Sequence, residues 1–186
     1  MRTRFFAPSL ATALVGLSFV ALFLPDASRA QAPPPPDTPD VIEPSKLFPL
    51  FPEPPSGWTA DKPEGATSDL GGFKLTNAHR DYKKGDGDNV PTASITILDA
   101  AANADYASAT TAGWKDSAET AEGYAKTITV DGNPGFEAFE TDRKHGSLWV
   151  FVAKRYFVQV ELNGLDPKQL QEWIKRVDLK KIAEVK

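Results

Sequence analysis

The chain has 186 residues, of which 41% are hydrophobic and 25% are charged, and it contains no cysteine. These fractions are those of an ordinary folded domain and argue against a wholly disordered chain. Without cysteine the chain has no disulfide, no thiolate metal ligand, no cysteine nucleophile and no acylated lipoprotein cysteine. The formal net charge of −4 argues against a nucleic-acid partner, because such binding needs clustered Lys and Arg.

The beginning of the chain has the pattern of an export signal. Two arginines precede an uncharged, mostly apolar run over residues 10–24, and Pro25 and several small residues follow it. This order predicts a signal peptide over residues 1–30, cleaved after Ala30 or, as the second choice, after Ala32. Removing residues 1–30 takes away three basic residues and one acidic residue, which leaves 18 basic and 24 acidic residues and a net charge of −6.

A retained membrane anchor is the alternative to cleavage. Residues 5–24 would just span the ~30 Å hydrocarbon core of a membrane. The polar and proline interruptions and the small residues that follow favour cleavage. We therefore expect a protein exported to the periplasm or beyond the cell, with no stable membrane span after cleavage and no nucleic-acid partner.

Residues 31–55 are predicted to be a proline-rich linker. Ten of the 16 prolines lie in this range. Because proline fixes φ and lacks an amide donor, the range is expected to be an extended polyproline II spacer. Its apolar segment, residues 47–51, is expected to attach the end of the linker to the domain. Residues 56–186 are predicted to form a single α+β domain.

The periodicity within this domain predicts six strands and two helices. The order is β-β-α-β-β-β-β-α, and it indicates an antiparallel sheet of about five to six strands with two helices packed on it. Asn103 and Asp166 are the expected N-caps of the two helices. The expected strands are residues 72–82, 90–98, 124–130, 136–141, 147–153 and 156–162, and the expected helices are residues 100–115 and 166–182.

Side chains capable of catalysis are few and scattered. His79 falls in a predicted strand and His145 in a turn, and they form no HxH or HxxxH spacing. Glu137 and Glu140 with Asp142 could mimic a catalytic carboxylate pair, but we expect them to be solvated on an edge-like strand. We therefore expect no catalytic residue, no metal ligand and no cofactor.

The aromatic residues are the remaining candidates for binding. Trp149, Trp58 and Tyr82 are the first candidates for the wall of a groove, although aromatic residues more often form the core. The resulting prediction is a monomeric, non-enzymatic exported protein that binds a protein partner or a small ligand in the cell envelope. The alternative is an envelope hydrolase that uses His79 or His145 with acidic neighbours. A third hypothesis is a stress or assembly factor tethered by an uncleaved signal anchor.

Several stretches resemble the PsbP-like α/β-sandwich superfamily. They are Gly57-Trp58, the GNPGFE stretch at residues 132–137, the paired strands of residues 147–162, and the final leucine-bearing helix. The resemblance implies an antiparallel sheet with packed helices and a non-enzymatic binding or accessory role. It transfers no functional residues to this chain.

Overall fold

The computed structural model describes residues 40–69, 74–100 and 103–186. The strands are β1 (Trp58–Ala60), β2 (Glu64–Asp69), β3 (Lys74–Lys84), β4 (Thr92–Asp99), β5 (Ala118–Thr120), β6 (Gly123–Val130), β7 (Asn133–Glu140), β8 (His145–Val152) and β9 (Tyr156–Asn163). The α-helices are α1 (Pro44–Leu47), α2 (Ala104–Ala112), α3 (Lys168–Ile174) and α4 (Leu179–Glu184), and the 3₁₀ helices are η1 (Phe48–Leu50) and η2 (Gly113–Lys115).

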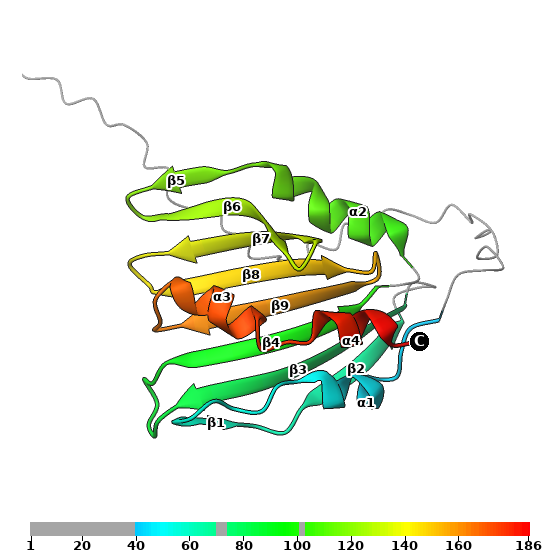
Figure 1. Cartoon of the computed structure of the whole chain (residues 1–186), viewed down its shortest axis with the longest axis horizontal. Helices are drawn as coiled ribbons and strands as arrows, with labels where there is room; N and C mark the ends of the chain where they lie inside the picture. Colours follow the sequence, from blue (N-terminus) through cyan, green and yellow to red (C-terminus); the bar gives the residue numbers. More distant parts are fainter. Residues whose placement is uncertain (1–39, 70–73, 101–102) are drawn as a thin grey trace, which may run out of the picture. The chain divides into compact units, whose positions relative to one another are not determined.

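The strands form one antiparallel sheet, which confirms the predicted α+β class (Figure 1). Its order is β1-β3-β4-β9-β8-β7-β6-β5, and β2 also pairs with β3. Strands β5 to β9 are consecutive hairpin partners, whereas the pairing of β4 with β9 joins residues distant in the sequence. In the chain, α2 lies between β4, in the middle of the sheet, and β5, the strand at one edge.

The sheet has nine strands, so the prediction of five to six was wrong. The three strands that were missed, β1, β2 and β5, lie outside the six ranges that the sequence pattern predicted to be strands. All six residues of β2 and all three of β5 are exposed. Because the alternation of apolar and polar residues marks strands with one buried face, edge strands with no buried face give no such signal.

One face of the sheet, which we call the helical face, carries the core. It presents alternate residues of the central strands, such as Ile95, Val150 and Val158, which are fully buried. Helices α3 and α4 cover this face, and Figure 1 shows them in front of the sheet together with α1. Both helices bury apolar side chains against it, namely Leu170, Trp173, Ile174, Leu179 and Ile182. This burial is the main source of the fold's stability.

The C-terminal helix differs from the predicted one at two points. It is divided, because α3 ends at Ile174 and α4 begins at Leu179, where the Asp178 side chain accepts a hydrogen bond from Lys181 N at 2.9 Å. The predicted N-cap at Asp166 is also wrong, since Pro167 is the cap residue of α3 and no side chain caps it.

Residues 42–51 fold onto the helical face, although they lie within the range predicted to be a proline-rich linker. Helices α1 and η1 form there, each with a proline in its first turn, where the missing amide is tolerated. The apolar segment at residues 47–51 packs into the core as predicted. The buried side chains in this region are Ile42, Leu47, Leu50 and Phe51.

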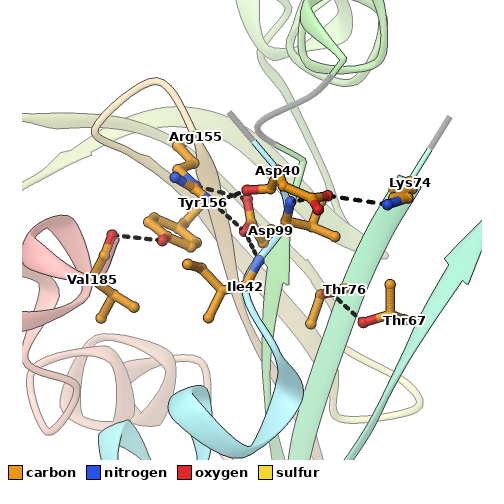
Figure 2. A network of polar contacts seen from close by, with 10 residues as sticks. Asp40, Ile42, Thr67, Lys74, Thr76, Asp99, Arg155, Tyr156 and Val185 are labelled. Atoms are coloured by element: carbon orange, nitrogen blue, oxygen red, sulfur yellow. Dashed lines mark hydrogen bonds and ion pairs between the residues drawn. The ribbon is translucent and has the colours of Figure 1, made fainter. Parts of the chain in front are cut away.

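A buried ion pair attaches the start of this segment to the sheet (Figure 2). Asp99, at the end of β4, is fully buried and receives two hydrogen bonds from Arg155, at 2.9 and 2.7 Å. The backbone N–H of Ile42 donates to the same carboxylate at 2.7 Å, and Arg155 donates to the carbonyl oxygen of Asp40 at 2.8 Å. We call Asp99, Arg155 and Ile42 the polar clasp.

Candidate binding surface on the open face of the sheet

The second face of the sheet, which we call the open face, carries a cluster of aromatic rings. Its centre is Phe157 of β9, which is fully buried. The Phe151 ring stacks on it with the centroids 4.5 Å apart, and the Trp149 ring meets it edge-on at 6.5 Å. Tyr106 of α2 and Trp114 of η2 also meet it edge-on, at 6.0 and 6.1 Å. We call these five residues the aromatic cluster.

Helix α2 and η2 cover the open face incompletely. In the part of the chain that the structure describes, neither contains a buried residue. The helix is started by Asn103, whose side chain accepts a hydrogen bond from Tyr106 N at 2.6 Å, as predicted. The Thr127 hydroxyl donates to the carbonyl of Trp114. Trp149 and Phe151 therefore stay half-buried, and part of each ring is accessible to a partner.

Polar side chains follow the aromatic cluster along the strands. The residue opposite Trp149 is Gln159, and Thr96 and His79 continue this row across the sheet. The Gln159 amide donates to Ser147 Oγ and to Glu161 Oε2, both at 3.4 Å. The open face thus changes from aromatic to polar along the strand direction.

The structure separates the three aromatic candidates. Trp149 lies on the open face in the aromatic cluster. Tyr82 is fully buried on the helical face, where its hydroxyl donates to the carbonyl of Pro52 at 2.9 Å. Burial raises the pKa of Tyr82 to about 12. Trp58 is half-buried and meets the ring of Trp173 edge-on at 4.9 Å. Tyr82 and Trp58 therefore belong to the packing under the helices and not to a surface shared with Trp149.

The two histidines both lie on the open face but far from each other. His79 is in the row of Trp149, three strands away, and His145 is four residues further along β8. Standard sheet spacing puts them about 14 Å apart across the strands and about 13 Å apart along them. The Nδ1 atom of His145 is 2.9 Å from the amide oxygen of Asn163. None of the ion pairs among the described residues involves a histidine.

The carboxylates near the β7 hairpin do not form a group. Glu137 was expected to be solvated, but only 1% of it is exposed, on the helical face. It accepts hydrogen bonds from Tyr124 at 2.5 Å and from Gln171 of α3, and Lys126 lies 3.2 Å away. Burial and the bond to Glu137 raise the pKa of Tyr124. Because β7 alternates, Glu140 points to the opposite face.

A shallow depression of about 280 Å³ lies where α3 gives way to α4. It is lined by residues 175–180 and Asp131. Three of its side chains are basic and two are acidic, and all five are exposed. It holds no buried polar group aimed at a ligand. In the described part of the chain, no group of three or more His, Asp or Glu side chains is placed to hold a metal ion.

No family model, curated protein or solved structure matches this chain. Within residues 40–69, 74–100 and 103–186, no helix has both the length and the apolar character needed to cross a membrane.

Proposed function

We propose that this chain is an exported, non-enzymatic protein that binds an envelope partner through the open face of its sheet. The aromatic cluster carries this proposal. The four rings around Phe157, those of Trp149, Phe151, Tyr106 and Trp114, are half-buried although they surround a buried phenylalanine. Accessible aromatic rings grouped on one face are typical of an interaction site. Export rests on the signal pattern of residues 1–30.

Binding fits the side chains of this face better than hydrolysis does. A hydrolase needs a nucleophile and a base within hydrogen-bonding distance, with a third group to orient the base. His145 has Asn163 as its hydrogen-bond partner, and His79 lies in a row with Thr96 and Gln159. These neighbours donate and accept hydrogen bonds without supplying an activated nucleophile. An accessory role is also what the PsbP-like resemblance implies.

A macromolecular partner fits this surface better than a small molecule. Small ligands are held in concave sites that bury most of their surface. The open face is a broad row of strands with an aromatic end and a polar end, which suits an extended contact with another polymer. The described depression at the α3–α4 junction lies on the other side of the sheet and is not required.

Site-specific photocrosslinking in the full chain tests this proposal. A photoreactive phenylalanine replaces Ser147 or Trp149 on the open face, and in the matched controls it replaces Lys175 or Lys180 beside the helices. We expect irradiation of intact cells to give the same adduct from both open-face positions and none from the controls. Adducts of equal yield from both faces, or adducts from the control positions alone, would contradict the proposal.

Export is tested separately by measuring the intact mass of the protein recovered from the envelope fraction. We expect the mass of a chain that begins at Gln31 or at Pro33. A recovered mass that includes residues 1–30 would support the tethered alternative and exclude cleavage.

A further inference from the structure

Two acidic groups on the open face, Glu161 and Asp81, lack a basic partner among the described residues, whereas Glu140 of the same face lies 3.3 Å from Arg143. An arginine or lysine nitrogen lies 2.7 Å from Asp99 and 3.2 Å from Glu137. Glu161 of β9 and Asp81 of β3 are on the open face, in one cross-strand row, and no ion pair among the described residues includes either. Lys83 follows Asp81 on the same strand and does not pair with it. Within the described residues, neither Glu161 nor Asp81 therefore has its charge compensated by an ion pair.

The position of Glu161 connects these acids to the aromatic cluster. Glu161 is half-buried, and the Gln159 amide donates to it at 3.4 Å. Gln159 is directly opposite Trp149, so Glu161 is two residues along the strand from the row of the indole. Two residues of a strand span about 6.6 Å. A lysine or arginine side chain can cover this span, with its stem over the ring and its charged end at the carboxylate.

We propose that the envelope partner presents a basic polypeptide segment to this face, with apolar residues on the aromatic cluster and Lys or Arg at Glu161 and Asp81. The inference rests on the proposed function and specifies its partner. Charge complementarity carries it, since Glu161 and Asp81 have no ion-pair partner among the described residues and the whole chain has a net charge of −4. An acidic protein or an anionic lipid surface would meet charge of the same sign.

Peptide binding to the full chain tests this charge preference. One labelled nonapeptide has leucines in its first half and lysines in its second, and a second peptide has glutamates in place of the lysines. We expect the lysine peptide alone to raise fluorescence anisotropy, with an affinity that falls as salt is added. The D81N/E161Q variant is expected to bind it about fivefold more weakly, which is the usual size of an exposed ion-pair effect.

The matched control is D166N/E172Q, which removes two exposed acids beside α3 with the same change in charge. It is expected to bind the lysine peptide as the unmodified chain does. The basic-partner inference is overturned if the glutamate peptide binds equally well, if both variants lose binding equally, or if neither peptide binds. It is also overturned if the chain instead binds a neutral glucan with no dependence on salt. If open-face crosslinks still form in that case, the proposed function stands and only the partner's chemistry is wrong.

Discussion

At the residue scale, buried carboxylates hold together parts of this chain that are distant in the sequence. Asp99 joins β4, the β8–β9 turn and the start of the described chain through the polar clasp. Arg155 has 17% of its side chain exposed and Asp99 has none. The hydrogen bonds that Arg155 donates to Asp99 raise the pKa of Arg155. Removing one partner would leave a buried charge without compensation.

Replacing Arg155 with alanine is expected to lower the free energy of unfolding by about 3 kcal/mol, because the buried Asp99 carboxylate would lose its two hydrogen bonds from Arg155 and the opposite charge. Urea denaturation measures this. The control is Lys74→Ala, which removes an exposed ion pair with Asp40 and is expected to cost less than about 0.5 kcal/mol. Equal effects of the two substitutions would contradict the role of the clasp.

Two buried tyrosines predict a loss of stability in alkali. Burial raises the pKa of Tyr82 and of Tyr156 to about 12 in each case, above the ordinary value of 10.0. The folded state therefore favours the neutral phenol. This contribution to stability is complete below pH 10 and is lost as the pH rises through about 12. The free energy of unfolding, measured from pH 8 to 12, is expected to fall less in Y82F/Y156F than in the unmodified chain. Parallel curves would refute this.

At the element scale, the helices differ in the contacts that stabilise them. Helix α2 has a side-chain cap but no buried residue, whereas α4 has a cap and buries Leu179 and Ile182. Helices this short do not persist without a cap or tertiary packing. Loss of α2 therefore leaves the core of the helical face intact, whereas loss of α4 disrupts it.

Removing the two caps is expected to have different consequences. Asn103→Ala should cost about 1 kcal/mol within α2 and speed amide exchange over residues 104–112, with little change in global stability. Asp178→Ala should lower the global free energy of unfolding by about 1 kcal/mol, because α4 packs on the core. Hydrogen exchange and urea denaturation of both variants distinguish the two cases, and a global loss in Asn103→Ala would count against a locally held α2.

The core of the whole molecule includes its proline-rich segment. Leu47 of α1 is fully buried with the side chains of the sheet and the C-terminal helices. Leu47→Ala in the full chain is expected to lower the free energy of unfolding by about 3 kcal/mol through the lost burial and the cavity left behind. Lys46→Ala, in the same helix but exposed, is expected to change it by less than about 0.5 kcal/mol. Thermal or urea denaturation compares them, and similar values would place α1 outside the core.

The residues of the open face show how much of a candidate binding site can be predicted from local sequence pattern. Trp149 could be selected from its strand, because residues 147–153 are apolar on both faces and one face of such a strand needs a separate cover. Phe157, at the centre of the cluster, gave no functional signal, since it alternates with Gln159 and Glu161 in an ordinary amphipathic strand. Its role depends on rings from α2 and η2 that are more than 40 residues away in the sequence.

The sequence by itself determined the fold class and the run of hairpins from β6 to β9, because alternation and turn residues act between neighbours in the chain. The length, the missing cysteine and the acidic charge restricted the chemistry before any contact was known. Only the tertiary structure decided which face stays open, that β4 pairs with β9, that Glu137 is buried, and that residues 42–51 join the core. These features depend on contacts such as that between Ile42 and Asp99, which are 57 residues apart, and no local pattern encodes them.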